Sequence, residues 1–465
     1  MSVWKNLSMK FKRLFRSGYD AGRTDNGNWM PVGGDAESIN SMSRDLIRHR
    51  ARDLERNADY MESTVQALER NVVGDGISLD CDIDDPDLET EIETCWRTWC
   101  HPENCDITGR SSFSEILKMA VRRMMVDGGI LVIAVYDKKS PYPLRLQIKE
   151  VDELDDTLSI CGENRVAGGI EVNRCNRPVA YHFKDYGLYA ETGKSIRIPA
   201  DRVIYLNRIK RPTQIREVSG FANILNRLKD TNQFIDAVTV KERILACYAI
   251  FIKKVNHAVN SFGRENHDPK TGAKPKTLAP GMVVELDPGD EIQVANPSGQ
   301  SSDAKGIVTI LLRAVSSALG LSYEAVSRDM SQSTYSSSRQ NLIEDHRTYK
   351  EWQNYLQEHL CRQVYKWWMT SCVLAGTLHI PDFWQDEEKY TASNWVAPGM
   401  SWIDPVKEVN ASRIALETNQ TTLQEIAAEH GKDWKQILLQ RAKEKEFMRE
   451  IGLEDDDDES KPNKK

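Results

Sequence analysis

The sequence has no run of apolar residues that could cross a bilayer, for which about 18 or more in succession are needed. Its first residues, MSVWKNLSMKFKRLF, also lack the apolar block and the small-residue cleavage site of a signal peptide. These absences predict synthesis in a cytoplasm and no association with a membrane.

Cysteine is present, but not as a disulfide framework: nine cysteines are scattered over the chain without a CxxC pair, and we expect reduced thiols. The densest group of possible zinc ligands is Cys95, Cys100, His101 and Cys105. Its intervals do not match the usual zinc-knuckle pattern. We interpret these residues as thiols packed beside Trp96 and Trp99, and we expect no metal or other cofactor.

An excess of positive charge is missing too. The chain carries 62 basic and 70 acidic side chains, a formal net charge of −8. This balance argues against a protein that grips nucleic acid by broad neutralisation of phosphates, although many soluble proteins have a similar charge. Any contact with DNA is therefore expected to be local or weak.

The main catalytic motifs are absent. There is no GxxxxGK[ST] phosphate loop, no GxSxG elbow and no HExxH pair. Asp382, Glu387 and Lys389 are residue types that can hold Mg²⁺ and activate water for phosphodiester cleavage. Only four residues separate the two acids, however, and Trp384 is one of them. An exposed loop is the favoured interpretation, and a metal-dependent nuclease is the alternative.

The first two hundred residues alternate helical and strand patterns. Apolar residues from Leu54 to Leu68 recur three or four apart, which predicts a helix over 48–72. Ser112 and Glu115 form a capping box for a second helix, which ends near Asp127. Strand composition follows at 130–136, 144–148, 169–172, 179–183 and 203–206, with a hairpin turn at 173–177. Residues 48–210 therefore read as one α+β lobe.

Long helices dominate the middle of the chain. Residues 221–254 contain no Gly or Pro and predict one long helix. Residues 255–300 resemble a small inserted subdomain with a strand at 282–286, and a helix at 307–319 ends at Gly320. A polar loop at 327–338 then precedes a predicted helix at 338–369, which would extend about 48 Å.

The two ends differ from the rest. Residues 1–16 are basic and have helical spacing of apolar residues, which fits either a partner-binding arm or a short solvated helix. Residues 22–40 have the composition of a linker. Near the other end, helices are predicted at 406–417, 422–430 and 434–448, before a self-repelling acidic run at 454–459.

Seven landmarks now line up in order with a known family. They are Arg52–Asn57 with Asn71–Ile77, Trp96–Trp99, Cys105–Arg110 with Ser112 and Phe113, Leu278–Met282 with Leu286–Glu291, Leu319–Glu324, Tyr335–Arg339, and Trp402–Glu408. Together they resemble the lambda-type phage portal family over roughly residues 40 to 450. Glu217–Gly220 departs from it, because an arginine-glycine pair is expected there, and residues 1–40 match none of its landmarks.

The resemblance implies an α+β ring subunit, dodecameric in assembled capsids, with an α/β wing, a long-helix stem, a small β-containing clip and a helical crown. The expected segments are a basic arm and linker at 1–40, wing at 41–218, stem helix at 219–254, clip at 255–302, second stem helix at 303–326, channel loop at 327–338, long wing helix and connector at 339–404, crown at 405–453 and acidic tail at 454–465.

The implied function is non-enzymatic: a ring at one capsid vertex of the virion, made in the host cytoplasm, through which double-stranded DNA is packaged and ejected. Terminase, the major capsid protein and head-tail connector or adaptor proteins would be its partners. A metal-dependent nuclease or a terminase-like packaging enzyme is the alternative, and a scaffold or adaptor without a channel is a third possibility.

The expected site is a polar lining that offers replaceable hydrogen bonds instead of fixed ion pairs, so that the duplex can slide. Its predicted residues are Arg328, Ser331, Gln332, Ser333, Thr334, Tyr335, Ser336, Ser337, Ser338 and Arg339.

Overall fold

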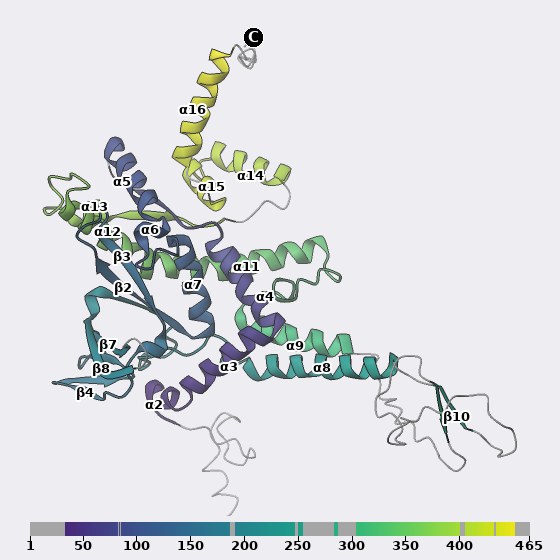
Figure 1. Cartoon of the computed structure of the whole chain (residues 1–465). Coiled ribbons are helices and arrows are strands. Elements are labelled where there is room, and N and C mark those ends of the chain that lie inside the picture. The colour runs from purple at the N-terminus through teal and green to yellow at the C-terminus, as the bar shows by residue number, and fades with distance from the viewer. Residues whose placement is uncertain are drawn as a thin grey trace, which may run out of the picture.

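The computed structural model in Figure 1 describes residues 33–81, 83, 85–186, 191–246, 250–253, 283–286, 304–399, 405–431 and 434–451. The predicted basic arm, the acidic tail and most of the predicted clip lie outside these residues. Within them, no helix is both long and apolar enough to span a membrane.

The first described helix, α2 (Ala36–Ser41), lies where the sequence predicted the end of a linker. The Asp35 carboxylate accepts a hydrogen bond from the backbone N–H of Ser38 and caps the helix. The backbone N–H of Ala36 donates to Thr213 Oγ1 at 2.9 Å, which ties α2 to a distant part of the chain. The predicted boundary of the linker at residue 40 is therefore wrong.

The helix predicted over 48–72 is instead three consecutive segments. They are α3 (Arg44–Asn57), α4 (Asp59–Leu68) and a π-helical segment at Glu69–Val73. Ala58 separates α3 from α4 because its backbone is extended, with φ −126° and ψ 110°. The turn at Gly74, with φ 52°, ends the series. The apolar face that the spacing predicted is buried, as Met61, Val65 and Leu68 show.

The helices α5 (Pro86–Trp99), α6 (Pro102–Cys105) and α7 (Phe113–Val126) pack with α4 beside a three-stranded antiparallel sheet. Its strand order is β3-β2-β9, formed by Leu144–Lys149, Gly129–Tyr136 and Val203–Asn207. The capping box that the sequence predicted at the start of α7 is present, with Ser112 and Glu115 bonded to each other's backbone.

A second sheet has the antiparallel order β4-β5-β6-β7-β8. Its strands are Ile160–Cys161, Asn164–Ala167, Ile170–Val172, Pro178–Tyr186 and Glu191–Pro199. The predicted hairpin turn before β7 is confirmed, because the backbone N–H of Asn173 donates to Arg177 O at 3.0 Å. The sequence did not predict β4, β5 or β8, nor the small sheet of β1 (Ser78–Cys81) and β12 (Ser393–Val396).

An aromatic cluster lies in the main core. Trp96 contacts the rings of Trp99, Phe113, Tyr365, Trp368 and Trp395, with centroids 4.8–5.7 Å apart. Cys105 is fully buried and its Sγ donates to the carbonyl of Cys100, so these thiols pack as predicted. Burial raises the pKa of Cys105 to about 12, which keeps the thiol protonated.

Two helices project from this body. They are α8 (Leu225–Ala246) and α9 (Ala304–Leu319), which pack side by side and point away from the sheets in Figure 1. The helix predicted through residue 254 ends earlier, and Ile250–Lys253 forms β10, paired in parallel with β11 (Val283–Leu286). The sequence Ile-Phe-Ile favours a strand, because β-branched and aromatic residues fit a pleated surface. The strand predicted at 282–286 is confirmed as β11.

After α9 the chain forms α10 (Tyr323–Ser327) and then the longest helical stretch. This stretch consists of α11 (Tyr335–Leu356), a π-helical segment at Gln357–Cys361 and α12 (Arg362–Ala375). A short α13 (Glu387–Thr391) precedes β12. The three predicted terminal helices are confirmed as α14 (Pro405–Glu417), α15 (Leu423–Glu429) and α16 (Trp434–Glu450).

Candidate functional site: the polar loop between α10 and α11

The polar loop is shorter than the sequence predicted. Ser327 is the last residue of α10, and Tyr335–Ser338 form the first turn of α11, so the loop proper is 328–334. The reason is a helix cap: Thr334 Oγ1 accepts the backbone N–H of Ser337, and the Ser337 hydroxyl accepts the backbone N–H of Thr334. The serines therefore start a helix, where the prediction had a loop.

Most of the predicted site residues face solvent. Ser333 and Ser338 are half-buried, and the exposed ones are Arg328, Ser331, Gln332, Thr334, Tyr335, Ser336, Ser337 and Arg339. The structure thus brings the predicted residues together on one loop and the helical turn that follows it. Exposed hydroxyl and amide groups of this kind can exchange hydrogen bonds with a passing polar partner.

The first half of the loop has a defined backbone conformation. Arg328 has φ 57°, a left-handed conformation that ends α10, and its backbone N–H donates to Glu324 O at 2.9 Å. The Asp329 carboxylate accepts the backbone N–H of Ser331 at 3.0 Å. Hydrogen bonds from Ser331 lower the pKa of Asp329, so this acid stays ionised and engaged within the loop.

Three side-chain contacts fasten α10 and the turn that precedes it to α11. Asp345 accepts hydrogen bonds from both the backbone N–H and the hydroxyl of Ser322, each at 2.6 Å. Thr348 Oγ1 donates to Gly320 O at 2.6 Å, and Asn341 Nδ2 donates to Glu324 at 2.9 Å. Burial is the main reason that the pKa of Asp345 is raised.

These contacts could not be predicted from the sequence. Gly320 and Ser322 belong to one of the family landmarks, and Ser322 is the kind of residue that caps a helix. No local pattern, however, points to Asp345, which lies 23 residues further along the chain.

The loop is also supported from the body of the molecule. Val326 of α10 is fully buried, and Ser63 of α4 donates its hydroxyl hydrogen to Val326 O at 3.0 Å. The position of the first end of the loop therefore follows from the packing of α10 against α4, and the second end continues into the exposed first turn of α11.

The two carboxylates considered for a nuclease belong to none of the groups with metal-ligand spacing that the described residues form. Glu387 pairs with Lys366 at 3.1 Å on a partly exposed surface. In the part of the chain that the structure describes, two groups have the spacing of metal ligands: Asp80, Glu89, Glu93 and Cys161, Glu171, His182. Neither contains Asp382 or Glu387, and neither contains the Cys95–Cys105 thiols.

Comparison with known proteins decides between the interpretations. Residues 22–353 match the sequence profile of the family described as phage portal protein, lambda family. The chain belongs to this family. It is therefore a portal protein, a structural component of the phage capsid vertex, where the subunits form the oligomeric ring through which DNA is packaged and ejected.

Relatives from three phages match most of the chain at low identity. A probable portal protein of Halomonas phage phiHAP-1 is 26% identical over 437 residues, which covers 90% of this chain and 84% of the relative. The portal protein of Escherichia phage N15 is 22% identical over 468 residues, covering 91% and 88%. Portal protein B of Escherichia phage lambda is 20% identical over 447 residues, covering 87% and 84%.

Solved structures with a similar chain trace come from gene transfer agent particles. One is the neck of an empty particle, computed with C6 symmetry, with a TM-score of 0.40 and 14% identity over 79% of this chain and 91% of that chain. Another is the virion of a native particle, with a TM-score of 0.38 and 12% identity over 84% and 92%.

Proposed function

We propose that the loop 328–334 and the first turn of α11 face the DNA channel of a ring of twelve subunits. The observation that carries this proposal is the exposure of an almost uncharged polar run on a loop whose first end is held by contacts of α10 with α4 and α11. In a ring, every copy of such a loop converges on the axis. Hydroxyl and amide groups there would offer the duplex hydrogen bonds that break easily as it slides.

The arrangement of the elements supports the same assignment. In Figure 1 the start of α11 and the pair α8–α9 extend on the same side of the molecule, away from both larger sheets. The sheet-rich lobe would then be the wing, α8 and α9 the stem, and α14–α16 the crown. The small sheet of β10 and β11 would belong to the clip.

The charged residues around the loop support the same assignment. Arg328 and Arg339 flank the loop and are exposed, while Asp329 is engaged within it. Transient contacts of the two arginines with phosphates would guide the duplex, and the net charge of −8 opposes tight binding elsewhere.

As the partners of the ring we propose a terminase during packaging, the major capsid protein around the wing, and head-tail connector or adaptor proteins below the clip. None of these roles requires catalysis by the chain itself, and synthesis in the host cytoplasm precedes assembly into the virion.

Electron microscopy of the purified chain tests the proposal. We expect closed rings with a central hole, weak binding of short duplex DNA without sequence preference, and no hydrolysis of ATP. The non-enzymatic role would be contradicted if an ATPase activity copurifies with the chain and is lost when residues of the chain are mutated. If no rings form under any assembly condition, the proposal of a DNA channel is contradicted.

A further inference from the structure

One face of the five-stranded sheet carries polar and metal-ligating side chains close together. Alternation along the strands and the strand register place Glu171 of β6, His182 of β7 and Arg197 of β8 on the same face. Asn164 and Cys161 follow on β5 and β4. The opposite face carries Ile170, Val172, Tyr181 and Phe183, which form a buried core.

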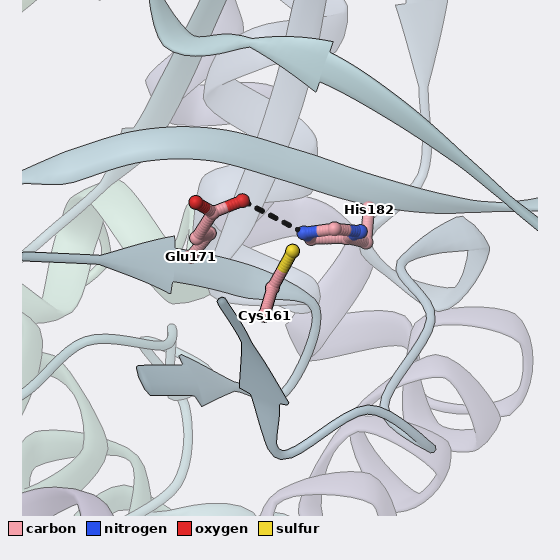
Figure 2. A group of neighbouring side chains, drawn as sticks. All are labelled: Cys161, Glu171 and His182. Carbon is pink, nitrogen blue, oxygen red and sulfur yellow. Dashed lines mark hydrogen bonds and ion pairs between the residues drawn. The ribbon is translucent and has the colours of Figure 1, made fainter. Parts of the chain in front are cut away.

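The three possible ligand atoms are near each other and two of the residues are buried. The sulfur, the ring nitrogen and a carboxylate oxygen of Cys161, His182 and Glu171 all lie within 4.8 Å of one another. His182 is 4% exposed and Glu171 is 2% exposed. Figure 2 shows the Cys161 sulfur and the Glu171 carboxylate both directed toward the His182 ring.

Backbone hydrogen bonds on both sides hold His182 in place. The backbone N–H of His182 donates to Gly169 O at 2.8 Å, and its carbonyl accepts the N–H of Asp155, also at 2.8 Å. His182 Nε2 lies 3.1 Å from Glu171 Oε2. Two ligands of one tetrahedral zinc ion, each bound at about 2.1 Å, would be separated by roughly 3.4 Å. Only small side-chain movements would therefore be needed to admit the ion.

In this structure the Arg197 guanidinium is the positive partner of the Glu171 carboxylate. Its Nε donates to Glu171 Oε2 at 2.7 Å and its Nη2 to Glu171 Oε1 at 3.2 Å, while Asn164 also donates to Oε1. The Arg197 side chain is 45% exposed, unlike the carboxylate that it binds. It can therefore turn into solvent without leaving a buried charge of its own.

We propose that Cys161, Glu171 and His182 bind a zinc ion, which replaces the Arg197 guanidinium as the positive partner of Glu171. A thiolate, an imidazole and a carboxylate form a donor set that zinc accepts and that the harder cations Mg²⁺ and Ca²⁺ do not favour. The ion joins β4, β6 and β7. Because β4 is paired through only two residues, the cross-link stabilises this edge of the sheet.

Zinc binding to the purified full-length chain, measured by equilibrium dialysis and elemental analysis, tests the proposal. We expect one zinc per subunit in the wild type and a loss of affinity of tenfold or more in Cys161→Ser, since a ligand is removed. Cys175→Ser is the matched control, because Cys175 is exposed in the turn before β7 and belongs to no such group. It should bind zinc like the wild type.

Two further measurements distinguish this site from adventitious binding. Co²⁺ in place of zinc should give a sulfur-to-metal charge-transfer absorption that disappears in Cys161→Ser. Arg197→Gln should tighten zinc binding by about tenfold, because the competing cation is gone. The proposal fails if the wild type takes up no zinc, if Cys161→Ser binds as well as the wild type, or if Arg197→Gln weakens binding.

Discussion

Asp345 of α11 accepts two hydrogen bonds from Ser322, one from its backbone N–H and one from its hydroxyl, both at 2.6 Å. The same Ser322 hydroxyl oxygen accepts the backbone N–H of Ala325 and so caps α10. One buried carboxylate thus fixes the start of α10 against α11, and through α10 it fixes the first end of the polar loop.

Loss of this contact should lower stability and displace the loop. We expect Ser322→Ala to cost about 1–2 kcal/mol, because it removes a helix cap and a charge-assisted hydrogen bond. Asp345→Ala should cost about 1–3 kcal/mol, and the double variant less than the sum of the two, since both remove the same contact. Denaturant unfolding of the purified chain measures these free energies. Ser331→Ala, in the exposed loop, is the control and should stay within about 0.5 kcal/mol.

Negative charge on the loop should block DNA without affecting assembly. In Ser331→Asp/Ser336→Asp, each subunit would present two carboxylates to the duplex phosphates. Like charges about 4 Å apart repel by about 1 kcal/mol even in water, and the ring multiplies this effect, so full heads should fall by roughly tenfold or more. The readout is the DNA content of heads assembled with each variant. A deletion of 331–338 would be a poorer test, because it removes the Thr334 cap and the first turn of α11.

Ser331→Asn/Ser336→Asn is the matched control, since asparagine has the size of aspartate but no charge. It should fill heads nearly as well as the wild type. If heads assembled with the aspartate variant fill normally with DNA, Ser331 and Ser336 do not line the channel.

Glu217 is fully buried within a network of hydrogen-bonded ions. Its carboxylate accepts from Arg216 at 2.7 and 2.9 Å, from Arg48 at 3.1 Å, and from the Tyr205 hydroxyl. Glu217→Gln should lower the free energy of unfolding by about 3–5 kcal/mol, because it leaves the buried Arg216 without the acid that it pairs with. Glu344→Gln, which removes an exposed acid paired with Arg347, should change it by less than about 0.5 kcal/mol. Urea unfolding of the two variants makes the comparison.

The same residue predicts a dependence on pH. Burial acts to raise the pKa of Glu217, but Arg216 and the Tyr205 hydroxyl outweigh it and lower the pKa to about 2, from 4.5. Because the folded pKa is the lower one, the contribution to stability is present above about pH 5 and is lost as the pH falls toward 2. The difference between wild type and Glu217→Gln should therefore shrink on acidification. A difference that stays constant between neutral pH and pH 3 would contradict this assignment.

Removal of Asp382 and Glu387, the acids considered for a nuclease, should change neither the stability nor the activity of the chain by much. Asp382→Ala/Glu387→Ala breaks one partly exposed ion pair with Lys366, which is worth at most about 1 kcal/mol. We expect no magnesium-dependent cleavage of DNA by the wild type and none by the variant. Cleavage that is present in the wild type and absent from the double variant would restore the enzymatic interpretation.

Much of the local structure could be predicted from the sequence, because the signals lie within a few residues of one another. The capping box of Ser112 and Glu115, the strand at 130–136 and the hairpin turn at 173–177 are such cases, and all three are confirmed. Predictions failed where a local signal was weak or was misread. The serines of 335–338 were assigned to a loop by composition, although Thr334 caps a helix there.

The contacts that position the candidate site could not be predicted in this way. The α+β class, many of the helices and strands, and the family could be inferred from patterns and landmarks within the sequence. That Ser322 pairs with Asp345, and that Cys161, Glu171 and His182 meet on one face of a sheet, became clear from the tertiary structure. Each of these partners comes from a different element. Their proximity depends on how the elements pack, which is set by apolar burial over the whole core and leaves no pattern in the residues nearby.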